Sequence, residues 1–85
     1  MIAKIFYLKN SPGQAAAEEY ARRLGRLSVE CELIDGDTPA GQAQTELYDL
    51  PDRPAMILVR DDGSPIQSWP HEFPPPSDVS YLAHQ

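Results

Sequence analysis

The chain is poor in cysteine, with a single one at position 31. One thiol cannot form an intrachain disulfide, and it cannot supply the several cysteines of a structural zinc site. Basic side chains are also scarce. The chain has seven Lys and Arg and thirteen Asp and Glu, which gives a formal net charge of −6. This balance argues against binding to nucleic-acid phosphates or to anionic membranes.

Long apolar runs are missing as well. No stretch approaches the roughly 20 apolar residues of a membrane-spanning helix, and no charged start followed by an apolar segment suggests a signal peptide. We therefore expect a soluble, cytoplasmic protein. Eighty-five residues, of which 41% are hydrophobic, predict one small domain over residues 1–85 with a modest core.

The first half of the chain alternates between strand and helix patterns. Residues 2–8 form an apolar run without clean alternation, which is typical of a strand buried on both faces. Residues 17–27 place apolar side chains at helical spacing, and Gly25 is a plausible terminator. Residues 28–34 alternate apolar side chains with glutamates, which favours a half-buried strand at the edge of a sheet.

The second half continues with a helix, a hairpin and a last helix. Thr38 and Pro39 predict the N-cap and first residue of a short helix. Residues 55–59 form the strongest strand pattern, and a turn over 61–64 leads into a returning strand over 66–69. The apolar stripe of the short helix is expected to be Ala40, Ala43, Leu47 and Leu50.

After a proline-rich loop, Ser77 is expected to cap the last helix, which carries Val79, Leu82 and Ala83. The element order is therefore β-α-β-α-β-β-α. It predicts an α/β sandwich in which one four-stranded mixed sheet is flanked by helices.

This order resembles the thioredoxin/glutaredoxin superfamily at several motifs. Residues 4–7 and 15–25 are similar to the first strand and first helix of glutaredoxins, and residues 77–82 resemble the start of their last helix. Arg53-Pro54 stands before the third strand, where these proteins carry a cis-proline. The resemblance covers nearly the whole chain apart from residues 69–76. It implies a thioredoxin-like fold and a cis Arg53–Pro54 bond.

The chain departs from this superfamily at the active loop. Redox-active members carry Cys-x-x-Cys or Cys-x-x-Ser there, whereas this loop reads Ser11-Pro12-Gly13-Gln14. A serine hydroxyl forms no disulfide, and Cys31 lies in the second predicted strand. The resemblance thus implies a redox-inactive member without catalytic residues. The loop itself predicts a capping box, in which the Ser11 hydroxyl accepts from the Gln14 amide and the Gln14 side chain bonds back to the Ser11 amide.

Three segments are candidates for contact with a partner. The first precedes the first helix, and the second is the proline loop, where superfamily members pair their backbone with a peptide or with glutathione. The third is an aromatic segment between prolines, which predicts either a binding patch or a lid folded over the core. The candidate residues are Ser11, Pro12 and Gly13, then Arg53 and Pro54, and finally Trp69, His71 and Phe73. We expect a binding or adaptor module for a protein or peptide, as a monomer or weak dimer.

An enzyme of the glutathione-transferase type is the alternative. In that case Ser11 would stand near a bound thiolate, and Asp78 matches a position that holds the glutamyl part of glutathione in glutaredoxins. The sequence replaces other parts of that site, with Gln67-Ser68 where glutaredoxins have paired glycines, and Asp78 also suits charge compensation at a helix N-terminus. We expect no metal and no resident cofactor, with glutathione as the ligand of this alternative only. A third possibility, pairing of two chains through the Glu30/Glu32 strand edge, is disfavoured by the two charges.

Overall fold

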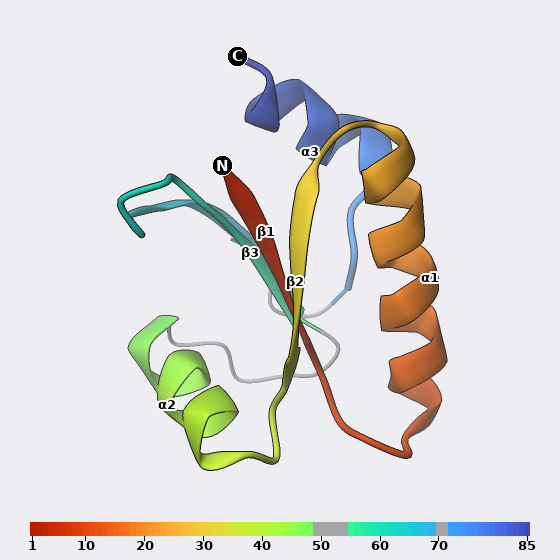
Figure 1. Cartoon of the computed structure of the whole chain (residues 1–85), viewed down its shortest axis with the longest axis vertical. Helices are drawn as coiled ribbons and strands as arrows, with labels where there is room; N and C mark the ends of the chain where they lie inside the picture. The colour runs from red at the N-terminus through yellow and green to blue at the C-terminus, as the bar shows by residue number, and fades with distance from the viewer. Residues whose placement is uncertain (49–54, 70–71) are drawn as a thin grey trace.

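Seven elements follow one another in the computed structural model, which describes residues 1–48, 55–69 and 72–85. They are β1 (Ile2–Tyr7), α1 (Pro12–Arg26), β2 (Glu30–Asp35), α2 (Pro39–Tyr48), β3 (Ala55–Val59), β4 (Pro65–Trp69) and α3 (Pro76–Ala83). The sheet has the order β2-β1-β3-β4, in which β1 is parallel to β2 and antiparallel to β3, and β4 is antiparallel to β3. This is the thioredoxin-like arrangement predicted from the sequence (Figure 1).

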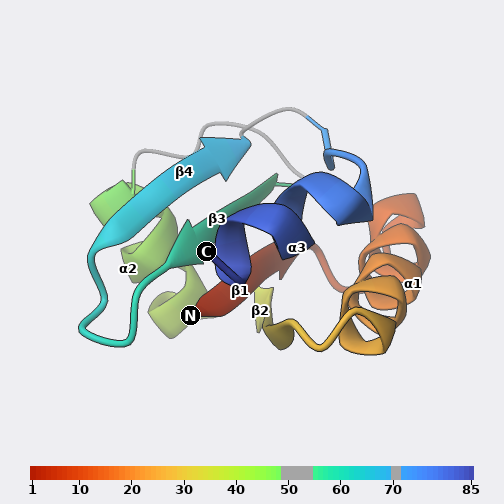
Figure 2. The same cartoon turned by 90° about the horizontal axis from the view of Figure 1, so that it is seen from above.

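The two central strands are buried on both faces of the sheet. Ala3, Ile5, Met56 and Leu58 point into a core that α1 and α3 cover, whereas Phe6, Ile57 and Val59 point into a second core on the other face. Figure 2 shows α1 and α2 on opposite sides of the sheet. The unbroken apolar run of β3 follows from this arrangement, because each of its faces meets a packed layer.

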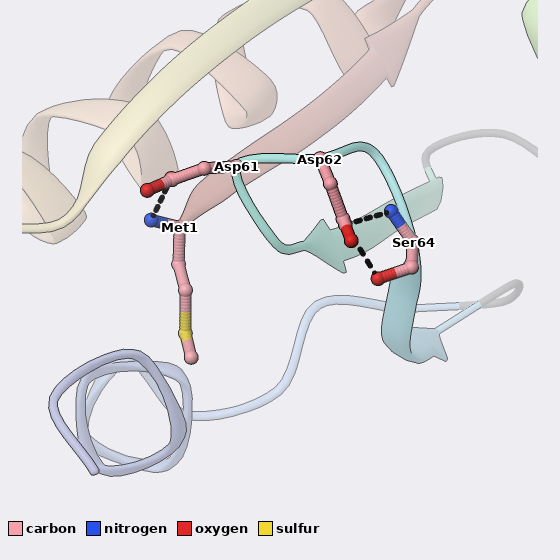
Figure 3. Close-up of polar contacts among 4 residues, drawn as sticks. All are labelled: Met1, Asp61, Asp62 and Ser64. Carbon is pink, nitrogen blue, oxygen red and sulfur yellow. Dashed lines mark hydrogen bonds and ion pairs between the residues drawn. The ribbon is translucent and has the colours of Figure 1, made fainter.

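The edge strands carry the polar side chains. Glu30 and Glu32 of β2 are exposed, as predicted, while Val29 just before them is buried. At the other edge, β4 is joined to β3 by the predicted turn, in which Ser64 donates two hydrogen bonds to the Asp62 carboxylate (Figure 3). The Met1 ammonium group lies 2.7 Å from Asp61 Oδ1 in the same hairpin. The Asp61 carboxylate is 90% exposed, so this ion pair contributes little to stability.

The orientation of α2 differs from the prediction. Ala40 and Ala43 are exposed and Leu47 is 73% exposed, so the described part of the expected stripe faces solvent, while Leu50 lies outside the described residues. The helix is anchored instead through Lys4, whose Nζ donates to Gln44 Oε1 at 3.0 Å. Its N-terminus packs through Gly41, which is buried. The spacing of apolar residues predicts that a helix has an apolar stripe. Which side of α2 faces the rest of the protein is set by the close approach of Gly41 to the backbone of Asp35.

Two predictions about helix ends are wrong, one for the end of α1 and one for the start of α3. At the end of α1 the Val29 amide donates to the Leu24 carbonyl and the Ser28 amide to the Gly25 carbonyl, which is a Schellman motif. Ser28 has φ 61° and takes the left-handed position that glycine usually holds, so Gly25 does not terminate the helix. Helix α3 begins at Pro76, whose fixed φ suits the first helical position, and Ser77 therefore lies in the first turn.

The predicted N-cap of α2 is confirmed, and the packing beside it can be tested by measuring stability. Thr38 Oγ1 accepts from the Gly41 amide at 3.0 Å, and a Cβ at Gly41 would overlap the Asp35 carbonyl oxygen. We expect Gly41→Ala to lower the free energy of unfolding by about 1–3 kcal/mol through overpacking. Gly25→Ala is the matched control, because a Cβ there meets no atom within 4 Å, and we expect it to raise the same quantity by about 0.5–1 kcal/mol.

Urea unfolding followed by circular dichroism measures both substitutions. A stabilising effect of Gly41→Ala would show that α2 does not approach the Asp35 carbonyl as described.

Candidate functional site

The loop between β1 and α1 leads into the N-terminus of the helix and contains the first candidate residues. Ser11 is the N-cap residue and Pro12 the first residue of the helix, as predicted. The hydrogen bonds differ from the predicted capping box. The Ser11 hydroxyl donates to the Leu8 carbonyl, and the Gln14 side chain accepts from the Asn10 amide at 2.7 Å rather than from the Ser11 amide. Asn10 has a left-handed backbone with φ 62°, which turns its backbone N–H toward the Gln14 side chain.

This geometry leaves the loop without a reactive group for redox chemistry. The side chain at the N-cap is a hydroxyl, and its hydrogen is already used inside the loop. The helix N-terminus that lowers the pKa of a thiol in redox-active proteins has no thiol to act on here.

Cys31 does not replace the missing nucleophile. It lies in β2, half-buried against the core under α1, with its Sγ 3.5 Å from the Val29 carbonyl oxygen. Burial raises the pKa of the Cys31 thiol above its ordinary value, and the neighbouring Glu30 carboxylate raises it further. A thiol of this kind is mainly protonated at neutral pH and is therefore a weak nucleophile.

Two of the predicted site residues line one cavity between β4 and α3. Trp69 is half-buried and packs against the core, while Asp78 is exposed in the first turn of α3. The cavity has a volume of about 290 Å³. Its wall consists of Gln67, Trp69, Asp78, Tyr81 and Leu82.

Phe73 belongs to a second cavity, on the surface of α1. Its ring stacks on that of Tyr20, with centroids 4.5 Å apart and an interplanar angle of 17°. The Tyr20 hydroxyl donates to the Pro74 carbonyl oxygen at 2.7 Å, which fastens the same segment to α1. Phe73 therefore folds back over the core, one of the two arrangements that the sequence predicts. The cavity measures about 260 Å³ and is lined by Ala16, Glu19, Tyr20, Arg23 and Phe73.

The structure does not bring all candidate residues together. Ser11, Pro12 and Gly13 line neither of these two cavities. Figure 1 shows the loop before α1 at one end of that helix and α3 beside its other end, and Asp78 belongs to α3. Arg53, Pro54 and His71 lie outside the described residues, and so does the predicted cis bond.

Three residues of the β4–α3 cavity were not predicted as site residues. Gln67 is two positions from Trp69 and thus shares its face of β4, whereas Tyr81 and Leu82 are three and four positions from Asp78 and share its face of α3. Those periodicities were visible in the sequence. What the sequence did not show is that these two faces line the same cavity.

Clusters of ligating side chains and long apolar helices are both missing from the described parts of the chain. Over residues 1–48, 55–69 and 72–85, no three His, Cys, Asp or Glu side chains are grouped so that they could hold a metal ion. None of the helices in these ranges is long and apolar enough to cross a membrane. Comparison with protein-family models and with curated proteins finds no match to the chain.

The state of Cys31 can be tested by its reactivity. We expect iodoacetamide at pH 8 to alkylate Cys31 in the folded protein at least about tenfold more slowly than in the urea-unfolded chain, because burial disfavours the thiolate. Glu30→Gln should raise the rate in the folded protein, by about twofold, since it removes a neighbouring negative charge. Glu32→Gln on the same strand is the control and should leave the rate unchanged. Mass spectrometry of timed samples gives the rates, and alkylation as fast as in the unfolded chain would contradict the assignment.

The buried hydroxyl of Tyr20 is expected to make the free energy of unfolding depend on pH. Burial, with smaller contributions from the negative charges of Cys31 and Asp78, raises the pKa of Tyr20 far above its ordinary value. The unfolded chain loses this proton near pH 10 while the folded protein keeps it, so the free energy of unfolding falls as the pH rises above about 10. Tyr20→Phe should remove that loss, at a cost of about 1 kcal/mol at neutral pH for the lost hydrogen bond.

Urea unfolding at pH 7, 9 and 10.5 measures the effect, and Tyr81→Phe, at a position 71% exposed, is the control. If the free energy of unfolding has the same pH dependence in Tyr20→Phe and Tyr81→Phe, burial does not raise the pKa of Tyr20.

Proposed function

We propose that this protein is a redox-inactive, thioredoxin-like binding module that recognises a protein or peptide partner. One observation carries the proposal. The fold is thioredoxin-like, but the residue at the N-cap of α1 is a serine whose hydroxyl is bonded within its own loop. A scaffold that keeps its architecture without its nucleophile is best suited to binding.

The proposed binding surface has three segments, which are residues 11–13, residues 53–54 and residues 69–71. Phe73, farther along the last segment, lies over the core instead. Trp69 gives this surface the strongest support, because its half-buried ring lines a cavity and large aromatic side chains contribute much of the affinity in protein interfaces. Trp69 ends β4, an edge strand of the described sheet. An extended segment of a partner can therefore be added along β4 by backbone pairing.

The alternative, a glutathione-dependent enzyme, has less support. The Ser11 hydroxyl donates to Leu8 and is not presented to a thiolate. Asp78, the residue expected near the glutamyl group, lines the β4–α3 cavity, whereas Ser11 does not. The geometry therefore favours the binding module.

Site-specific photo-crosslinking in the native host tests the binding function. A photoreactive amino acid at Gln67, which is exposed beside Trp69, is expected to give a discrete adduct that excess unlabelled protein suppresses. The same residue at Pro12 is expected to capture the same partner. Arg22 on the outer side of α1 is the matched control, with a 61% exposed side chain, and should give no such adduct.

A suppressible adduct at Gln67 alone would retain the binding function and remove the loop before α1 from the surface. Absence of an adduct at Gln67, or equal adducts at Gln67 and Arg22, would overturn the proposal.

A further inference from the structure

The β4–α3 cavity combines a carboxylate with aromatic walls. Trp69 contributes an indole ring from β4 and Tyr81 contributes a phenol ring from α3. Asp78 carries the only charged group among the described residues of the wall. Gln67 adds an amide at the rim. A volume of about 290 Å³ lies at the lower end of ligand pockets, so the cavity fits one side chain rather than a large cofactor.

The charges around this cavity favour a cation. Among the described residues, none that lines it is basic. Over the described ranges 1–48, 55–69 and 72–85, no Lys or Arg side chain forms an ion pair with Asp78. The chain as a whole carries a net charge of −6, which attracts basic partners and repels acidic ones. An anionic ligand would meet an unpaired carboxylate here.

The aromatic walls narrow the choice of cation. A guanidinium group is planar, stacks on aromatic faces and donates paired hydrogen bonds to a carboxylate. Cations over Trp or Tyr rings gain further attraction from the ring quadrupole. Leu82 is half-buried at the same wall and offers apolar contact to the methylene stem of such a side chain.

We propose that the β4–α3 cavity binds the guanidinium group of an arginine in a basic segment of the partner. This inference rests on the proposed binding function and names the chemistry that the binding surface recognises. Asp78 accepts the hydrogen bonds of the guanidinium group, and the rings of Trp69 and Tyr81 flank it.

Fluorescence of Trp69, the only tryptophan of the chain, tests this site directly. The probe is a tripeptide with blocked ends and a central arginine, titrated to millimolar concentration at low salt. Its matched control contains citrulline, which keeps the shape and loses the charge. We expect a saturable change with the arginine peptide, and affinity for the citrulline peptide lower by about tenfold or more, as for the loss of a charged hydrogen bond.

Two variants separate the contributions of the carboxylate and of the ring. Asp78→Asn should weaken binding of the arginine peptide by about tenfold, whereas Glu72→Gln, which removes an exposed charge outside the cavity, should change it by less than about twofold. Tyr81→Leu should weaken binding while the affinity ratio of arginine over citrulline persists. Circular dichroism confirms that each variant is folded, and both Asp78 and Tyr81 are exposed positions.

Several results would overturn the inference. They are equal affinity for the arginine and citrulline peptides, equal effects of Asp78→Asn and Glu72→Gln, and tighter binding of glutathione or of a glutamate peptide. A suppressible adduct at Gln67 together with any of these results would keep the binding function and reject the arginine site. Absence of both the adduct and the arginine response would reject both.

Discussion

The domain depends on the burial of β1 and β3 on both faces of the sheet. Their alternating side chains fill two separate cores, one under α1 and α3 and one on the opposite face. An 85-residue chain buries a modest share of its surface, so neither layer can be lost without exposing an apolar strand. The apolar side chains of β1 and β3 are therefore unavailable to a partner, and the described sheet exposes its edge strands, β2 and β4. Glutamates line β2, whereas β4 carries the aromatic ring and the cavity.

The element order could be predicted from the sequence because hydrophobic period and turn residues are local signals. The run 55–59, the Thr38 cap and the turn at 61–64 are all found in the structure. The predictions that failed concern details that tertiary contacts decide. The side of α2 that faces the protein is set by the close approach at Gly41, and the partner of the Gln14 side chain is set by the left-handed backbone of Asn10.

Only part of the candidate site could be predicted from the sequence. Trp69 and Asp78 could be named separately, but their shared cavity depends on how α3 lies relative to β4, which brings together residues far apart in the chain. Phe73 was expected either on a binding surface or over the core, and only its stack on Tyr20 decides between them. The loop before α1 was correctly assigned as a helix start without a thiol. The scaffold is therefore thioredoxin-like, while the proposed binding surface includes β4 and α3 as well as the loop before α1.

A basic segment of the partner is proposed to bind between β4 and α3, at the cavity lined by Trp69 and Asp78. Two-dimensional NMR spectra of the isotope-labelled protein, recorded while a basic peptide is added, test this most directly because they report on every backbone amide at once. Shift changes are expected to cluster at residues 67–69 and 78–82, which line or flank the cavity. Shift changes that leave these residues unaffected, or that spread evenly over the surface, would contradict binding there.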